Sequence, residues 1–301
     1  MRLNEYYEKQ ELTISFEIFP PKTEDGLRQL EARLSRLIEL NPSFISVTYG
    51  AMGSTRSRTL EIASKIRREY GMETAHHLTC VGANRHEIQK VLEGIRAAGI
   101  ENIVALRGDP PKGETKFQAP KDGYSYAVEL VEHIRNFGGF GIAVAGYPEK
   151  HIEASDFETD LYYLKDKADA GADVIITQLF YDNSYFYRFV ERCRAIGIRQ
   201  PIVPGLLPIL NVQQIRRITS MCGSSIPDSL QNELQAVEND EPKVMQVGIR
   251  HITRQVQDLL EQGVPGVHFY VLNRFFHIAE IMAELGFTVR KPQPAEAHPE
   301  L

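Results

Sequence analysis

Residues 14–22 read ISFEIFPPK, a short apolar run that holds one carboxylate in its middle and ends at two prolines. The alternation of side chains predicts a β-strand, in which Glu17 shares its face with Ser15 and Phe19. An ionised carboxylate on a face that packs against apolar groups needs a partner or takes a raised pKa. The alternative is a face open to solvent, where a carboxylate needs neither.

Eight runs of this kind occur along the chain, and longer amphipathic segments typical of helices separate them. The first run is 12–19, and the others are 44–50, 74–80, 101–108, 141–148, 173–180, 201–208 and 266–273. Eight alternating strands and helices predict a (β/α)8 TIM barrel, an α/β fold whose active site lies at the C-terminal ends of the strands. An extra helix is expected at 226–238, between the seventh and eighth strands.

The segment after the first strand shows the helical pattern clearly. Thr23 is expected to cap this helix, and Glu24 and Asp25 follow in its first turn. The apolar stripe of the helix consists of Leu27, Leu30, Leu34, Leu37 and Ile38. No break in composition, repeat or Gly/Ser linker divides the chain, so we predict one catalytic domain over residues 1–301, with a loose tail at about 288–301.

Composition and charge indicate a globular protein with a small-molecule partner. Of 301 residues, 43% are hydrophobic and 25% are charged, which is typical of a domain with a substantial core. A formal charge of -6 and the lack of Lys/Arg runs argue against binding to nucleic acid or anionic membranes. No segment approaches the ~20 apolar residues of a membrane span. Three widely spaced cysteines indicate a reduced, cytoplasmic protein; they are Cys80, Cys193 and Cys222.

Polar residues follow seven of the eight predicted strands, close to their C-terminal ends. They are Glu17, Thr48, His77, Arg107 with Asp109, Tyr147 with His151, Gln178, and Tyr270 with Arg274. In a barrel these groups converge on one mouth, whereas an open doubly wound sheet gathers its ligand contacts around one switch point. The barrel brings more of these residues together, and it places Glu17 in the mouth, where a partly desolvated acid is useful.

Several common signatures are absent from the sequence. No G-x-G-x-x-G follows the first strand and no G-x-x-x-x-G-K-[ST] occurs, so neither a Rossmann dinucleotide site nor a P-loop is predicted. His76 and His77 are neighbours on one strand and point to opposite faces, so they cannot easily chelate one ion. We therefore expect no metal site.

Eight motifs carry a resemblance to a known family. In chain order they are SFEIFPPK, FISVTYGA, HHLTC, NIVALRGDPP, AGYPEKH, DLYYLKDKADAGAD, ITQLFYD and HFYVLNR. Together they resemble the methylenetetrahydrofolate reductases of the short bacterial type, which are flavin enzymes on a (β/α)8 barrel. The resemblance runs from about Leu12 to about Gly286, and we expect no regulatory extension of the kind that longer eukaryotic members carry.

The resemblance implies FAD as the cofactor, with contacts assigned motif by motif. They are Thr48, His77, Leu106, Arg107, Gly108, Asp109, Tyr126, Ala127, Tyr147, His151, Asp160 and Lys167. Of these, Arg107, His77 and Lys167 can offset pyrophosphate charge, and Gly108 allows the backbone to approach the isoalloxazine ring closely.

The resemblance also implies a set of folate contacts, namely Glu17, Asp109, Gln178, Tyr270 and Arg274. The Gln178 amide both donates and accepts, which suits a pterin edge, and Arg274 suits the p-aminobenzoyl-glutamate part. Two positions depart from the family. Leu179 stands where a phenylalanine is common, and Ile218 falls about where some members place a phenylalanine near the substrate.

The implied reaction has two half-reactions at one site. NADH or NADPH passes a hydride to FAD and leaves, and 5,10-methylenetetrahydrofolate then takes the hydride to become 5-methyltetrahydrofolate, which feeds methionine synthesis. Glu17 suits the acid that opens the imidazolidine ring to a 5-iminium cation, and Asp109 suits the group that stabilises this cation. On this interpretation Glu17 is protonated at neutral pH. The resemblance further implies a homo-oligomer.

Two other classes stay open at this point. A proline-dehydrogenase-like flavin barrel would share the fold and the cofactor but would not reduce a folate. A folate-binding subunit without catalytic activity is disfavoured, because both Glu17 and Asp109 are present. The electron donor also stays open between NADH, NADPH and a partner flavoprotein.

Overall fold

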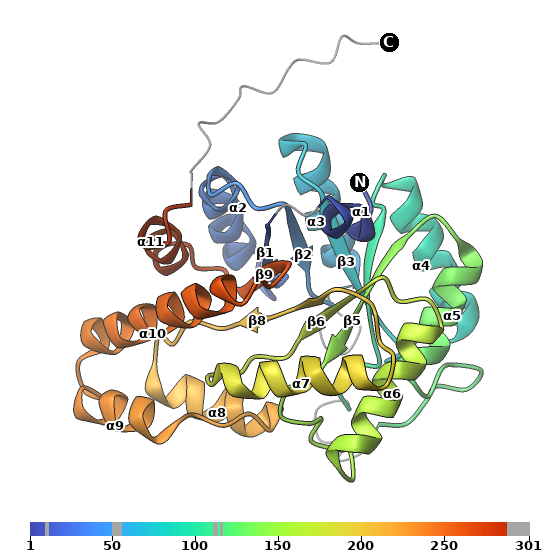
Figure 1. The fold of residues 1–301 in the computed structure, drawn as a ribbon. Helices are drawn as coiled ribbons and strands as arrows, with labels where there is room; N and C mark the ends of the chain where they lie inside the picture. The colour runs from blue at the N-terminus through green and yellow to red at the C-terminus, as the bar shows by residue number, and fades with distance from the viewer. Residues whose placement is uncertain (10–11, 50–55, 111–113, 115–116, 288–301) are drawn as a thin grey trace.

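A barrel of parallel strands surrounded by helices forms the computed structural model, which describes residues 1–9, 12–49, 56–110, 114 and 117–287 (Figure 1). The strands are β1 (Thr13–Ile18), β2 (Phe44–Val47), β3 (Thr74–Thr79), β4 (Asn102–Leu106), β5 (Gly141–Gly146), β6 (Val174–Thr177), β7 (Ile202–Val203), β8 (Gly205–Leu206) and β9 (Gly266–Tyr270). They pair in the order β7-β6-β5-β4-β3-β2-β1-β9-β8, and every pairing is parallel.

Pro204 divides the seventh strand of the barrel into two short strands. Proline has no N–H to give to a ladder, so β7 and β8 are separate, and β7 pairs with β6 whereas β8 pairs with β9. The Pro204 carbonyl still accepts a hydrogen bond from the backbone of His268 at 2.9 Å. Because β7 and β8 are one residue apart, the sheet closes on itself, and the predicted (β/α)8 barrel is confirmed.

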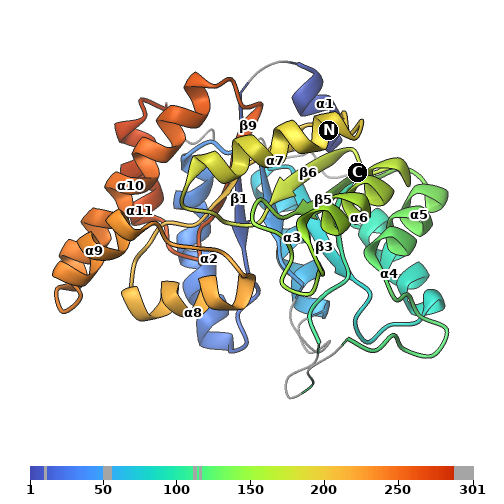
Figure 2. The ribbon, with the colours of Figure 1, turned by 60° about the horizontal axis from the view of Figure 1, so that its bottom comes forward.

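The helices form a ring around the strands, as the two views in Figures 1 and 2 show. They are α1 (Leu3–Glu8), α2 (Glu24–Glu39), α3 (Arg56–Tyr70), α4 (Arg85–Ala97), α5 (Ala127–Phe137), α6 (Phe157–Asp169), α7 (Asn183–Ala195), α8 (Val212–Cys222), α9 (Asp228–Ala236), α10 (Glu241–Glu261) and α11 (Phe276–Glu284). The predicted extra helix is confirmed as α9. Thr23 caps α2 as predicted, because its side chain accepts a hydrogen bond from the Gly26 N–H.

The strands pack apolar residues on their outer faces along their length, and on their inner faces mainly near the N-terminal end. Outward-facing Phe16 and Ile18 are fully buried under the surrounding helices. Inside, a second apolar cluster fills the N-terminal end, and it contains Leu3 and Tyr7 of α1 together with Phe44, Ala75, Val104, Ala143, Val174, Ile176 and Val203. In Figure 1, α1 lies at one end of the barrel and α8 at the other. The apolar cluster therefore closes the N-terminal end of the barrel.

Strand register brings the inner side chains of the C-terminal end to one level. Glu17 of β1 lies opposite Tyr270 of β9 and Ser46 of β2.

No helix within the described ranges is long and apolar enough to cross a membrane. The predicted tail at about 288–301 and the end of the second predicted strand at Gly50 lie outside the described residues.

Candidate active site

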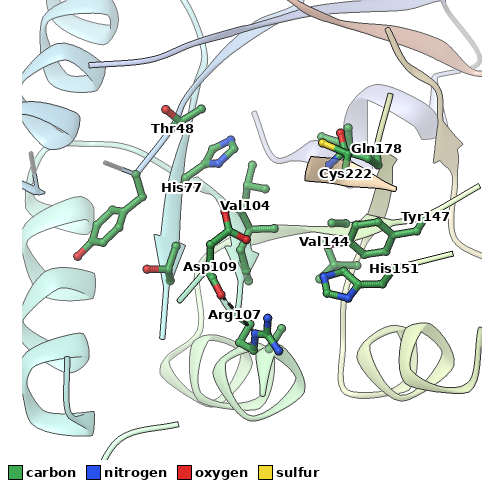
Figure 3. Close-up of a pocket in the computed structure, with 18 of the residues that line it drawn as sticks. Thr48, His77, Val104, Arg107, Asp109, Val144, Tyr147, His151, Gln178 and Cys222 are labelled. Atoms are coloured by element: carbon green, nitrogen blue, oxygen red, sulfur yellow. Dashed lines mark hydrogen bonds between the residues drawn. The ribbon is translucent and has the colours of Figure 1, made fainter. Parts of the chain in front are cut away.

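A cavity of about 940 Å³ opens at the C-terminal ends of the strands, within the volume range of small-molecule and cofactor sites. Every predicted site residue except Arg274 lines this cavity. Figure 3 shows Arg107 and Asp109 following β4, Tyr147 and His151 following β5, and His77 on β3. Arg274 is exposed in the segment between β9 and α11, and it is not among the lining residues.

Glu17 contacts two histidines inside the barrel. Its Oε2 atom lies 3.2 Å from Nε2 of His77 on β3 and 3.4 Å from Nε2 of His268 on β9. Nδ1 of His268 is 2.7 Å from the Ser15 hydroxyl, and the His268 side chain is fully buried. These four residues form a polar cluster, which we call the Glu17 cluster, and Glu17 and His77 of this cluster line the cavity. Glu17 is therefore only partly exposed, and it has two partners.

The charge state of Glu17 differs from the prediction. Burial acts to raise the pKa of Glu17, but the electrostatic effect of His77 and the contacts with both imidazoles outweigh it and lower the pKa to about 2. The expectation of a carboxyl group that is protonated at neutral pH is thus wrong for the protein without ligands. The partners of Glu17 come from β3 and β9, and the sequence of β1 alone does not reveal them. They reverse the direction of the expected pKa shift.

His268 was missed by the sequence prediction, although a signal for it exists. It precedes Tyr270 by two residues on β9, so strand alternation points both side chains to the same face. The edge of the Tyr270 ring packs on His268 with the ring centroids 5.4 Å apart. The Tyr270 hydroxyl donates a hydrogen bond to the Thr177 carbonyl at 2.7 Å, so this tyrosine forms a fixed wall of the cavity.

Arg107 is held by a carboxylate that the sequence prediction did not include. Its Nη1 and Nη2 atoms donate to the two carboxylate oxygens of Glu153 at 2.6 and 2.7 Å. Its guanidinium also lies 5.2 Å from the centroid of the Phe117 ring. Glu153 raises the pKa of Arg107 despite partial burial. Glu153 lies in the loop between β5 and α6, where no periodic pattern could have indicated its role.

A second cation lies on the α6 side of the cavity. Lys167 donates a hydrogen bond from Nζ to the Ala145 carbonyl at 2.6 Å. Burial lowers the pKa of Lys167 to about 8, and the nearby Asp160 opposes this shift. Asp160 accepts a hydrogen bond from the His151 N–H at 3.0 Å, and burial raises the pKa of Asp160. Arg107 and Lys167 thus both have a carboxylate close by.

Gly108 lines the cavity in a conformation and a close contact that favour glycine. Its φ is +87°, and a β-carbon there would lie 2.6 Å from Cγ2 of Val81 and 3.1 Å from Cβ of Thr79. Thr79 lines the cavity, but its hydroxyl oxygen is buried and, in the described part of the chain, has no hydrogen-bond partner. Only glycine fits at position 108, because a β-carbon would clash with Val81 and side chains rarely adopt this φ.

Three further lining residues, Gln178, Ile218 and Cys222, carry no charge. The Gln178 side-chain oxygen accepts a hydrogen bond from the Leu179 N–H at 2.9 Å, which leaves the amide NH₂ to donate. Ile218 and Cys222 line the cavity one turn apart on α8, and burial raises the pKa of the Cys222 thiol to about 11. Cys222 is therefore a neutral thiol, and α8 presents no aromatic ring at Ile218.

The cavity lining contains the site residues that the motifs imply, apart from Arg274. Comparison with known proteins identifies the family. The family profile described as methylenetetrahydrofolate reductase matches residues 2–286. The chain belongs to the methylenetetrahydrofolate reductase family. The match covers every strand of the barrel and every lining residue named above.

Relatives in the methylenetetrahydrofolate reductase family include plant and bacterial proteins. Methylenetetrahydrofolate reductase (NADH) 1 of Arabidopsis thaliana is 44% identical over 290 residues, which are 93% of this chain and 49% of that protein. The 5,10-methylenetetrahydrofolate reductase of Escherichia coli is 39% identical over 264 residues, which are 88% of this chain and 87% of that protein. The chain thus spans about half the length of the plant relatives that it matches.

Solved structures support the barrel fold of this reductase family. An uncharacterised protein from Clostridium thermocellum, described as binding two copies of 5-methyl-5,6,7,8-tetrahydrofolic acid, aligns with a TM-score of 0.63 at 19% identity over 94% of this chain and 97% of its own. Oxaloacetate acetylhydrolase aligns with a TM-score of 0.51 at 14% identity over 99% of this chain and 89% of its own. At these identities the likeness shows the fold alone.

Proposed function

We propose that the protein reduces 5,10-methylenetetrahydrofolate to 5-methyltetrahydrofolate, with FAD as the cofactor and NADH or NADPH as the electron donor. The observation that supports this most strongly is the Glu17 cluster in the same cavity as Arg107, Gly108 and Asp109. The Glu17 cluster offers a path for a proton, and the other lining residues include the cations Arg107 and Lys167. Because the chain belongs to the reductase family, we assign these residues to the reduction of a folate.

The lining residues fit FAD in their charge. Arg107 and Lys167 line the cavity and offer positive charge to the pyrophosphate. When bound there, FAD would supply the redox chemistry between the nicotinamide and the folate. The protein has to bind both reactants and to supply a proton.

The proton requirement assigns a task to the Glu17 cluster. Reduction of the methylene bridge adds one hydride and one proton, and the proton goes to N10 as the bond from the bridging carbon to N10 breaks. His77 or His268, each within 3.4 Å of the ionised Glu17 carboxylate, first passes a proton to Glu17, and Glu17 delivers it to N10. The resulting iminium cation carries positive charge, which the carboxylate of Asp109 stabilises.

The single cavity supports a ping-pong order in which nicotinamide and folate occupy the same space in turn. We propose that the product serves methionine synthesis in the cytoplasm, as the family resemblance implies. That the protein forms a homo-oligomer is still a prediction.

The cofactor and the donor can be tested on the purified protein. We expect a yellow protein that releases FAD on denaturation and loses its visible flavin absorbance when NADH or NADPH is added without oxygen. Comparison of the two nucleotides at equal concentration identifies the donor. Release of FMN alone, or a colourless protein that cannot be reconstituted with FAD, would contradict the proposal. Reduction by proline instead of a nicotinamide would favour the proline-dehydrogenase-like class.

A further inference from the structure

Phe19 presents an exposed aromatic ring at the rim of the cavity. It directly follows β1, it is 43% exposed, and it lines the cavity. Among the described residues, it is the only phenylalanine that does so. Exposed apolar side chains are common on protein surfaces, so exposure alone assigns no role to this ring.

The backbone on both sides of this ring is fixed. The Phe19 N–H donates to Oδ1 of Asn273 at 3.0 Å, and Nδ2 of Asn273 donates to the Phe19 carbonyl at 2.8 Å. Pro20 and Pro21 follow and restrict the chain further. Asn273 and its neighbour Leu272 have φ values of 56° and 48°, a conformation that is costly for leucine. The rim therefore holds Phe19 in place at a conformational cost.

Other aromatic rings in the cavity already have local partners or lie elsewhere. The Tyr270 hydroxyl bonds to the Thr177 carbonyl, and the Tyr147 ring packs edge-on against His151 at 4.7 Å. Exposed Tyr126 and Tyr163 belong to the α5 and α6 side. Because α8 contributes the aliphatic Ile218, Phe19 is the ring that stands free beside Glu17.

We propose that Phe19 is the platform on which the p-aminobenzoyl ring of the folate stacks, an inference that rests on the proposed function. In the substrate, this ring is bonded directly to N10, the nitrogen that Glu17 protonates. Phe19 lies two residues from Glu17 on the same strand face, so their Cα atoms are about 7 Å apart. Aromatic pairs are favourable at centroid distances of about 4.5–7 Å. A folate that gives N10 to Glu17 thus brings its ring within reach of Phe19.

The inference separates folate binding from the chemical steps. Phe19 has no titratable group, and in this arrangement it contacts a part of the folate that no bond change involves. Loss of the ring should therefore weaken binding of the folate without changing the limiting rate. Flavin reduction by the nicotinamide should be unaffected.

The test compares Phe19→Leu, which keeps an apolar side chain, with Phe19→Tyr, which keeps the ring. Phe276→Leu is the matched control, because Phe276 is a 69% exposed phenylalanine in α11 that does not line the cavity. Binding of 5-methyltetrahydrofolate to the oxidised enzyme is measured by titration, and flavin reoxidation is followed over a range of methylenetetrahydrofolate concentrations.

We expect Phe19→Leu to raise the dissociation constant and the half-saturating folate concentration about fivefold, which corresponds to ~1 kcal/mol. Its limiting rate should stay within about twofold of the wild type, and Phe19→Tyr and the control should match the wild type. Unchanged folate binding in Phe19→Leu, or equal losses in the Leu and Tyr variants, would overturn the inference but not the proposed function. A wild-type protein that does not bind folate at all would overturn both.

Discussion

Replacement of Glu17 by glutamine should separate the two proposed half-reactions. The amide keeps the size and polarity of the carboxyl group but cannot deliver a proton to the folate. Hydride transfer from the nicotinamide needs no acid from the protein, whereas opening of the folate ring does. We therefore expect Glu17→Gln to stay folded and to bind FAD, to be reduced within a few-fold of the wild-type rate, and to be slow with the folate.

The size of this loss follows from the neighbours of Glu17. A positioned general acid contributes about 10²–10⁴-fold to a rate. The imidazoles of His77 and His268, which lie 3.2 and 3.4 Å from the carboxylate, stay in the variant and can supply part of the proton transfer. We therefore expect a loss near the lower end of that range, at least ~100-fold, which corresponds to ~2.7 kcal/mol in the barrier.

Anaerobic stopped-flow absorbance measures both half-reactions of Glu17→Gln through the flavin band. Reduction is started with NADH or NADPH, and reoxidation is started with methylenetetrahydrofolate. If both rates stay within a small factor of the wild type, Glu17 is only a structural partner of the two histidines. If both rates fall together, the substitution has disturbed the cavity rather than removed an acid.

Acid unfolding gives an independent check on the Glu17 cluster. The pKa of Glu17 is lowered from 4.5 to about 2 in the folded protein. A carboxyl group with a depressed pKa stabilises the folded state above pH 4.5, and this contribution is lost as the pH falls through about 2. Between these two values the stability of Glu17→Gln, measured by urea unfolding, should fall less steeply than that of the wild type. Parallel curves would contradict the assigned charge pairing.

Three further substitutions test the rest of the cavity. Asp109→Asn should slow flavin reoxidation by the folate at least ~tenfold and reduction by the nicotinamide much less, and equal slowing of both in stopped flow would rule out its role towards the cation. Gly108→Ala should weaken FAD binding at least ~tenfold, because a β-carbon would lie 2.6 Å from Val81 at a φ of +87° and would shift this part of the cavity wall. Full FAD content after purification would show that FAD binding does not depend on this conformation. Glu153→Gln should weaken FAD binding about two- to fivefold in titrations of the apoprotein, because Arg107 loses a half-exposed ion pair, whereas tighter binding would mean that Glu153 competes with the cofactor.

The fold was predictable because strand alternation and the turns between elements are local properties of the sequence. The same alternation correctly put Glu17 on the inner face, and it could have identified His268 from its position before Tyr270. The break in the seventh strand was missed, although Pro204, which lacks a backbone N–H, lies in the middle of the predicted 201–208 strand.

Features that depend on distant contacts were not predictable. The pKa of Glu17 is set by His77 and by His268, which is 251 residues away in the chain, so its direction emerges only when the barrel closes. The ion pair between Arg107 and Glu153 depends on the conformation of a loop without periodic pattern. Arg274, assigned by motif, is exposed after β9 and outside the cavity lining.

A single-turnover reaction with the folate tests the central claim most directly, because it does not depend on the natural electron donor. Bound FAD is reduced photochemically without oxygen and mixed with methylenetetrahydrofolate, and both the flavin absorbance and the folate product are measured. The proposed function predicts that the oxidised flavin spectrum returns as one 5-methyltetrahydrofolate forms per FAD. Flavin that stays reduced in the presence of the folate, yet is reoxidised by a quinone, would contradict it.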